Sequence, residues 1–120
     1  MKGFDPSTGL GYIQEGDYIQ VTLPYARKAG EGVLIGSLFG VCVVDGAQGD
    51  SINIHTEGVY GLTAATGAST DATEWAKAYW DNSAKKITPV STNNSYVGVF
   101  AAAKATTDAA ARVRLNEFVV

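Results

Sequence analysis

The sequence predicts a mainly β protein, a small single-domain β-barrel or sandwich of about seven short strands with one short helix. Three observations support this prediction. Apolar residues alternate with polar ones in several short segments, as they do in strands that bury one face. Turn-forming residues separate these segments roughly every eight to twelve positions. With 120 residues, 46% of them hydrophobic, the chain can bury one core, and a second independent core is not expected.

The first 11 residues, MKGFDPSTGLG, show neither a strand-like nor a helix-like pattern. They contain three glycines and one proline, a composition typical of a flexible arm. We therefore expect a flexible N-terminal arm over residues 1–11 and a β-rich domain over residues 12–120. Phe4 and Leu10 give the arm two apolar side chains that could dock onto another surface.

The strands expected in the first half of the chain follow from alternation and are bounded by turn residues. Pro24 ends the first of them, and Gly36 with Ser37 supplies a tight turn between the second and the third. In the last of them, Ile52 and Ile54 face one side, and their polar neighbours face the other. These segments cover residues 18–23, 33–35, 38–44 and 50–62.

The segment ASTDATEWAKAYW (68–80) contains the only expected helix. Thr70 or Asp71 is suited to cap its free amides, and Glu74 lies in its first turn, so we expect one or two helical turns over 72–77. A β-hairpin follows, with the turn DNSA between its strands. Further strands are expected over 96–103 and 111–120, and the sequence shows no clear internal repeat.

Several classes of function do not fit the sequence. A net charge of −3 with only scattered basic pairs argues against nucleic-acid binding. No apolar run approaches the roughly 20 residues that a membrane helix needs. One cysteine and one histidine are too few for a zinc site, and Cys42, which lies between two valines, is expected to be a buried apolar residue. His55 is expected to be an exposed or hydrogen-bonded strand residue rather than a catalytic one.

The glycines of GVLIGSLFGVCVVD (32–45) match neither phosphate-binding motif. A Walker loop requires Gly-Lys, and no glycine of this chain precedes a lysine. In GEGVLIG (30–36) the last glycine comes one residue too late for a dinucleotide-binding fingerprint. We expect these glycines to form turns, and we expect no catalytic residue, cofactor, metal or small-molecule substrate.

Two alternatives based on the chemistry of the side chains stay open. The main one is a carbohydrate-binding or adhesive β-module that uses Trp75, Tyr79 or Trp80, although adjacent strand residues point to opposite faces, so one of the last two is expected in the core. The weaker one is a glycan hydrolase with a carboxylate pair. The candidate pairs are Glu15 with Asp17, Asp45 with Asp50, and Asp71 with Glu74.

The order of the motifs resembles that of a known family, the capsid cement or head decoration proteins of tailed bacteriophages and prophages. Proteins of this family have been labelled as recombinases, a label that the missing Walker motif contradicts here. The resemblance covers residues 12–116. Its motifs are YIQEGDYIQVT (12–22), GVLIGSLFGVCVVDGAQGD (32–50), TEGVYGL (56–62), AYWDNSAKKITPV (78–90), YVGVFAAA (96–103) and ARVRLN (111–116).

The resemblance implies a structural, non-enzymatic protein of the virion. Such a protein, made in the cytoplasm of the host bacterium, would bind the exterior of the expanded head as a homotrimer and stabilise it by bridging major capsid protein subunits. Residues 1–11 precede the point at which similar proteins usually begin. We expect Phe4, Leu10, Tyr12 and Ile13 to bind the capsid by adding a strand to a sheet edge. An N-terminus without a function is the other interpretation.

Overall fold

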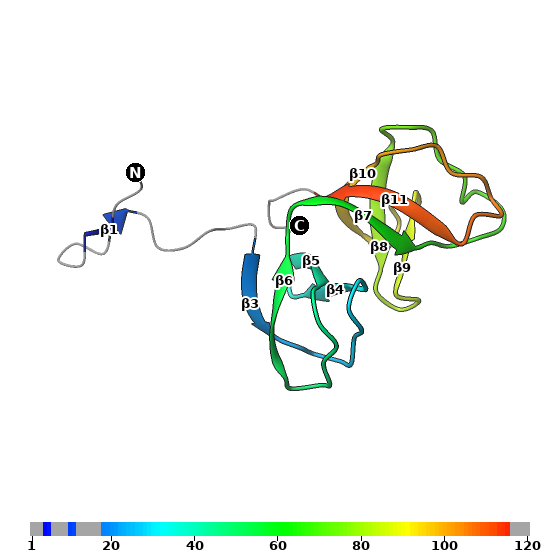
Figure 1. Ribbon diagram of the computed structural model, residues 1–120. Helices are drawn as coiled ribbons and strands as arrows, with labels where there is room; N and C mark the ends of the chain where they lie inside the picture. The colour runs from blue at the N-terminus through cyan, green and yellow to red at the C-terminus, as the bar shows by residue number, and fades with distance from the viewer. Residues whose placement is uncertain (1–3, 6–9, 12–17, 116–120) are drawn as a thin grey trace.

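The computed structural model describes residues 4–5, 10–11 and 18–115, with side chains from residue 18 onward. A four-stranded and a five-stranded antiparallel sheet make up its body (Figure 1). The first sheet consists of β3 (Tyr18–Thr22), β4 (Gly32–Ile35), β5 (Leu38–Cys42) and β6 (Ser51–His55). The second consists of β7 (Gly58–Thr63), β8 (Lys77–Asp81), β9 (Lys86–Thr88), β10 (Ser95–Phe100) and β11 (Ala110–Leu115). Two short strands, β1 (Phe4–Asp5) and β2 (Leu10–Gly11), pair with each other.

The mainly β prediction is confirmed, but the expected number of strands is too low. Nine strands lie in the two large sheets instead of about seven. One difference arises at residues 50–62, which form two strands, β6 and β7, that belong to different sheets. Thr56 and Glu57 connect them, and the buried Thr56 lies at the change of sheet.

The helix expected over 72–77 is wrong, and the part of the chain that the structure describes contains no helix. Trp75 N–H donates to the Phe100 carbonyl (2.7 Å), and Phe100 N–H donates to the Ala76 carbonyl (2.9 Å). Ala72 forms a backbone bridge with Lys104, and Trp75 has a left-handed φ of +70°. Pairing with a distant segment therefore takes the backbone groups that a helical turn would use. Accordingly, no helix among these residues is long and apolar enough to cross a membrane.

The two sheets repeat one topology, although the sequence shows no clear internal repeat. The strand order of the first sheet is β3-β6-β5-β4. Its first strand along the chain, β3, therefore pairs with its last strand, β6, which pairs with β5, and β5 pairs with β4. The order β7-β11-β10-β8 follows the same rule, and β9 adds one strand beyond β8. We call residues 18–55 unit 1 and residues 58–115 unit 2. Residues 18–115 therefore contain the same strand order twice.

The connections between strands repeat as well. Isolated bridges close both units at equivalent places, Arg27 with Gly46 and Ala72 with Lys104. The Asp50 carboxylate accepts a hydrogen bond from the amide three residues before it (2.8 Å), and Asp108 does the same (2.9 Å). The matching segments are GVCVVDGAQGD (40–50) and GVFAAAKATTD (98–108), which share Gly, Val, Ala and Asp at identical spacing.

Two of these shared residues, Gly40 and Gly98, explain why the strands are rich in glycine. A Cβ atom at Gly40 would lie 2.7 Å from the His55 carbonyl oxygen, and one at Gly98 would collide with the Arg114 carbonyl oxygen. His55 and Arg114 occupy equivalent places, since they pair with Val41 and Val99. The glycines allow two backbones to approach closely, so here their role is to permit packing within the sheet.

The buried residues form two clusters instead of the single core that the sequence suggests. Strand β5 contributes to both because its two faces are apolar: Phe39 and Val41 point towards unit 2, and Cys42 points away from it. Phe39 packs against Trp80, with ring centroids 5.0 Å apart and ring planes tilted by 52°. The cluster within unit 1 consists of Leu23, Val33, Cys42, Ile52 and Ile54. The larger one joins the units through Phe39, Val41, Leu62, Ala64, Ala78, Trp80, Ile87, Val97, Phe100, Ala111, Val113 and Leu115.

Candidate interaction surfaces

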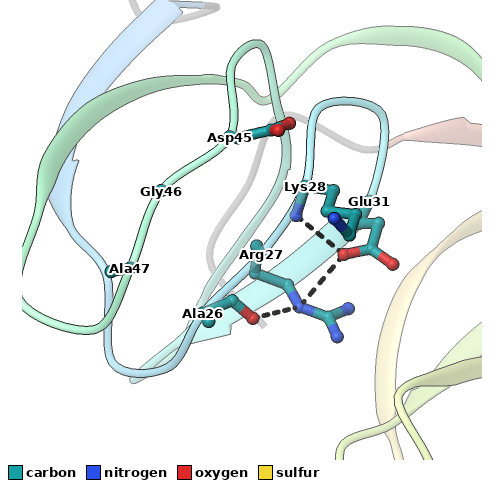
Figure 2. A pocket seen from close by; sticks show the side chains of 7 residues that line it. All are labelled: Ala26, Arg27, Lys28, Glu31, Asp45, Gly46 and Ala47. Carbon is teal, nitrogen blue, oxygen red and sulfur yellow. Dashed lines mark hydrogen bonds and ion pairs between the residues drawn. The ribbon is translucent and has the colours of Figure 1, made fainter.

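A pocket of about 570 Å³ lies between the two long connections of unit 1 (Figure 2). Its polar groups pair with the loops that carry them. Glu31 Oε1 accepts a hydrogen bond from Lys28 N (2.8 Å) and lies 3.6 Å from Arg27 Nε. These contacts stabilise the turns that line the pocket. The lining residues are Ala26, Arg27, Lys28, Glu31, Asp45, Gly46 and Ala47.

Of the carboxylates considered for a hydrolase, those of Asp45 and Asp50 each bond to a different backbone amide. Asp45 accepts the Ala29 amide (2.8 Å), whereas Asp50 accepts the Ala47 amide (2.8 Å). Asp71 and Glu74 are exposed on one connection of unit 2. Glu15 and Asp17 lie outside the described residues. Within the described ranges, no three His, Cys, Asp or Glu side chains gather as metal ligands would.

Cys42 and His55 have structural surroundings. Cys42 is buried at 2% exposure, as expected, and burial raises the pKa of its thiol although the nearby Arg27 charge lowers it. His55 is half-buried, with Nδ1 2.6 Å from the Tyr60 hydroxyl oxygen and its ring edge-on to Tyr18. The hydrogen-bonded strand histidine that the sequence predicts is therefore present.

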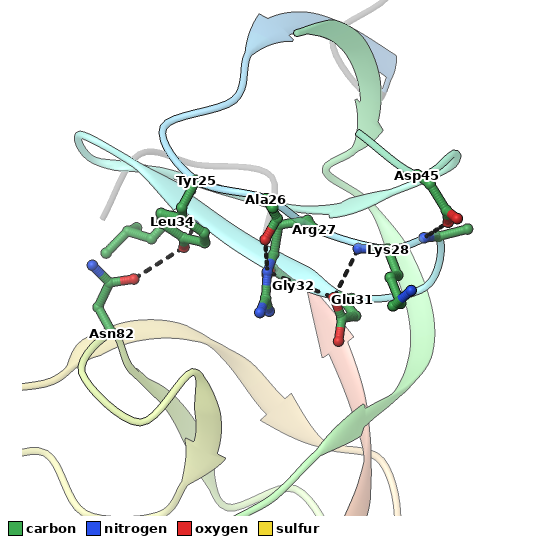
Figure 3. Close-up of polar contacts among 10 residues, drawn as sticks. Tyr25, Ala26, Arg27, Lys28, Glu31, Gly32, Leu34, Asp45 and Asn82 are labelled. Carbon is green, nitrogen blue, oxygen red and sulfur yellow. Dashed lines mark hydrogen bonds and ion pairs between the residues drawn. The ribbon is translucent and has the colours of Figure 1, made fainter. Parts of the chain in front are cut away.

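Polar contacts join unit 1 to the β8–β9 hairpin (Figure 3). The Tyr25 hydroxyl donates to Asn82 Oδ1 (3.1 Å) and accepts the Leu34 amide (3.2 Å). Trp80 Nε1 donates to the same Asn82 oxygen (3.0 Å), and the Lys85 ammonium lies 4.3 Å from the centre of the Tyr25 ring. This network forms a polar rim around the Phe39–Trp80 contact, so it fixes the units against each other.

Among the capsid-binding residues expected in the arm, the structure describes Phe4 and Leu10 only by their backbone. Phe4 pairs with Gly11, and Asp5 pairs with Leu10. Tyr12 and Ile13 lie outside the described residues. The assignment of these four residues to capsid binding stays a prediction.

Trp75 is the most exposed large apolar side chain that the structure describes, at 60% exposure. Its φ of +70° is a conformation that costs a residue with a side chain roughly 1–2 kcal/mol. The equivalent position in unit 1 is Gly30, with φ +86°, and its amide bonds to Cys42 as that of Trp75 bonds to Phe100. Unit 2 thus holds a tryptophan where its own fold favours glycine, and such strained residues concentrate at functional sites.

The connection that carries Trp75 is held in place by a buried lysine. Lys104 is 4% exposed, and its ammonium donates to the carbonyls of Thr70 (3.0 Å) and Ala105 (2.9 Å). Thr70 in turn donates to the Gly67 carbonyl (2.7 Å). Trp75 is therefore displayed on an ordered loop. The helix predicted over 72–77 includes Trp75, and only an alignment of the two units reveals that this residue stands at a glycine position.

The outward face of the second sheet combines aromatic and basic side chains. Tyr79 and Tyr96 lie with ring centroids 5.8 Å apart, and the Lys77 ammonium is 5.7 Å from the Tyr96 ring. Arg112 and Arg114 are exposed on the neighbouring strand β11. Tyr79 is half-buried whereas the adjacent Trp80 is 2% exposed, which confirms that one of the two belongs to the core.

Comparison with known families gives a match over most of the chain. A family model described as phage cement protein matches residues 13–115. No curated protein and no solved structure matches this chain.

Proposed function

The chain belongs to the phage cement protein family, and from this membership we propose that it binds the exterior of an expanded phage head and bridges major capsid protein subunits. The match to the family over residues 13–115 carries the proposal. It supports a role associated with the phage capsid, and the described residues form an all-β structure. Asp45 and Asp50 each accept a hydrogen bond from a backbone amide, as side chains that stabilise loops do.

Mass action gives the physical mechanism. A ligand that binds only the mature lattice stabilises that lattice by RT ln(1 + [L]/Kd) for each occupied site. A protein that touches two neighbouring capsid subunits adds contacts that must break before the subunits separate. We propose that the chain does this as a homotrimer on the outer surface of the virion, after synthesis in the host cytoplasm.

We assign Trp75 as an anchor on the capsid. Tryptophan is enriched among the residues that dominate binding energy, because its large apolar surface is desolvated on contact. Here its ring is exposed before binding, and the loop beneath it is already ordered by Lys104. The strain at φ +70° is retained although glycine would remove it, which is understandable if the side chain is needed in the complex.

The N-terminal arm is the second proposed contact. Phe4, Leu10, Tyr12 and Ile13 would order on the shell, where backbone hydrogen bonds to an exposed strand of the major capsid protein supply affinity. Deleting residues 1–11 is expected to lower occupancy on expanded heads. Unchanged occupancy would contradict this role.

The decisive experiment adds purified full-length protein to expanded, undecorated heads and measures occupancy and resistance to heat. We expect saturable binding that raises the temperature at which the heads release DNA. Absence of binding would contradict the proposed function itself.

Variants at Trp75 test the anchor separately. Trp75→Gly is expected to fold, since Gly30 occupies the equivalent position with the same sign of φ, and to bind heads at least about tenfold more weakly. Val44→Ala, at an exposed side chain of unit 1, is the matched control and should bind as the native chain does. If folded Trp75→Gly binds normally, Trp75 is not the anchor, but the family role stands.

The exposure of Trp75 also favours one alternative, a carbohydrate-binding or adhesive module of the virion. Sugars stack on exposed aromatic rings, so binding would change the fluorescence of Trp75. A saturable fluorescence change with sugars that Trp75→Gly abolishes, together with no binding to heads, would favour this alternative.

A further inference from the structure

The contact between the two units is a model for a contact between two chains. Unit 1 presents Leu34, Phe39 and Val41 to unit 2, and there the Phe39 ring covers Trp80. Trp80 is 2% exposed in the cluster that joins the two units. One surface of a unit therefore acts as a docking face, and another acts as its receptor.

The docking face exists a second time in unit 2. Leu34 lies opposite Phe39 in the β4–β5 pair, and Tyr79 lies opposite Tyr96 in the equivalent β8–β10 pair. Two positions along β4 and β8, on the same outward face, Val41 pairs with Gly32 in unit 1 and Val99 pairs with Lys77 in unit 2. Tyr79, Tyr96 and Val99 form what we call the outer docking face, and all three are partly exposed.

The receptor also exists a second time, in unit 1. Ile35 is the equivalent of Trp80. Ile35 pairs with Leu38 at the end of the β4–β5 ladder, and Trp80 pairs with Ser95 at the end of the β8–β10 ladder. Val21 is likewise the equivalent of Leu62, which is 3% exposed. In unit 1 these positions are only partly buried. We call Ile19, Val21, Ile35 and Leu38 the apolar rim of unit 1.

We propose that copies of this chain associate head to tail, with the outer docking face of one copy packed on the apolar rim of unit 1 in the next. In this contact, Tyr96 packs against Ile35 of the next copy in the same way as Phe39 packs against Trp80 within one chain. The contact buries aliphatic and tyrosine side chains, and tyrosine is enriched at protein interfaces.

Such a contact joins two different surfaces, so each copy keeps one free face for a further copy. Interfaces of this kind close into rings when the rotation between copies permits, and otherwise they extend as filaments. Closure after three copies would give the trimer proposed above. The contact uses neither Trp75 nor the N-terminal arm, so it can fail while capsid binding stands, and the reverse also holds.

Cysteine cross-linking of the full chain distinguishes this contact from a two-fold symmetric one. The chain offers a suitable background because Cys42 is buried. We expect a mixture of Ile35→Cys and Tyr96→Cys to form mixed disulfide-linked dimers under mild oxidation, while neither variant forms dimers with itself. The chain with both substitutions should give closed or laddered oligomers whose mass reports the ring size.

The control replaces Tyr96→Cys with Thr92→Cys, whose exposed site lies outside the docking face. The Ile35–Tyr96 pair should cross-link at least about tenfold faster than this control, because docking raises the local concentration of the two thiols. Equal rates, or a self-linked Ile35→Cys or Tyr96→Cys dimer that forms as fast as the mixed one, would overturn the proposal.

A charge substitution tests the contact without any added cysteine. Sedimentation of the native chain should show association that increases with concentration, and Tyr96→Glu should abolish it while its unfolding curve shows a folded protein. Native protein that stays monomeric both in solution and on expanded heads would overturn the proposal.

Discussion

Gly98 lies where strand β11 comes too close to β10 for any side chain. A Cβ atom there would collide with the Arg114 carbonyl, which belongs to the backbone and cannot rotate away. Gly40 meets the same restriction in unit 1, from the His55 carbonyl. Both units have glycine at this place, whereas the buried residue two positions later is Cys42 in unit 1 and Phe100 in unit 2.

We expect Gly98→Ala to destabilise the protein by about 3 kcal/mol, because the strands must separate to admit the methyl group. Gly61→Ala is the control: Gly61 lies on β7 of the same sheet, and a Cβ there would meet no atom within 4 Å. This variant should change the free energy of unfolding by less than about 0.5 kcal/mol. Urea unfolding measures both, and a similar small effect for the two variants would contradict the packing argument.

Cys42 makes stability depend on pH in the alkaline range. Burial raises the pKa of its thiol above the ordinary value of 9.0, so the folded state keeps the proton where the unfolded state has lost it. Above that value the unfolded state binds fewer protons, and stability falls as pH rises until the folded thiol also ionises. Below it the thiol is protonated in both states, and its effect on stability does not change.

We therefore expect the native chain to lose stability between pH 8 and pH 10 faster than Cys42→Val does, by at most about 1.4 kcal/mol per pH unit. The variant differs from the native chain only at this side chain, so the difference between the two curves isolates the thiol. Parallel curves for the two proteins in chemical unfolding would contradict the assigned pKa direction.

At the scale of elements, alternation predicted strands such as β6 and β11, which bury one face. The burial of Ile52 and Ile54, and of Val113 with Leu115, follows the predicted pattern. The helix failed because a capping pattern describes only local preferences, and here Ala72 and Trp75 bond to residues about 30 positions away. The repeat escaped detection because only four of eleven residues match between 40–50 and 98–108, and a register shift between Tyr96 and Gly98 breaks the alignment before them.

The two units protect the same sheet edge in different ways. Strand β9 covers β8 in unit 2, whereas side chains cover β4 in unit 1. The Tyr25 hydroxyl accepts the Leu34 amide, and Arg27 Nη1 donates to the Gly32 carbonyl (3.4 Å). Such covering prevents an edge strand from pairing with another chain.

Tyr25→Phe is expected to destabilise the protein by about 1–2 kcal/mol, since the Leu34 amide loses its acceptor and Asn82 loses one donor. It should also increase light scattering on heating, because the β4 edge becomes available to other chains. Tyr18→Phe, at a hydroxyl on the 46%-exposed Tyr18, is the control and should have little effect on either quantity. Equal behaviour of the two variants would contradict the role assigned to the Tyr25 hydroxyl.

At the scale of the whole molecule, Phe39 couples the two units. It is 5% exposed and packs on Trp80, while its equivalent Tyr96 lies on the outer docking face. We expect Phe39→Ala to cost about 3–5 kcal/mol and to broaden the unfolding transition, because the units then unfold less cooperatively. In the monomer, Tyr96→Ala should cost about 1 kcal/mol or less. A sharp, native-like transition for Phe39→Ala would contradict this coupling.

The functional surfaces were less predictable than the fold. The order of short motifs indicated the family, since each motif fixes a turn or a strand that the fold requires. Neither the exposure of Trp75 nor its conformation could be inferred, because both depend on Phe100, 25 positions further along the chain. Tyr79 and Trp80 illustrate the limit: alternation placed one of them inside, and only the packing of Phe39 shows that it is Trp80.

Only Thr56 and Glu57 separate β6 from β7, so the connection between the two units is too short to extend under load. If the arm binds one capsid subunit and Trp75 binds another, a force that separates these subunits acts on both the short connection and the Phe39–Trp80 contact. Rupture under such a load depends on the rate of unfolding rather than on equilibrium stability. The force that the protein withstands would then depend on the contact between unit 1 and unit 2, and not on the two capsid-binding sites.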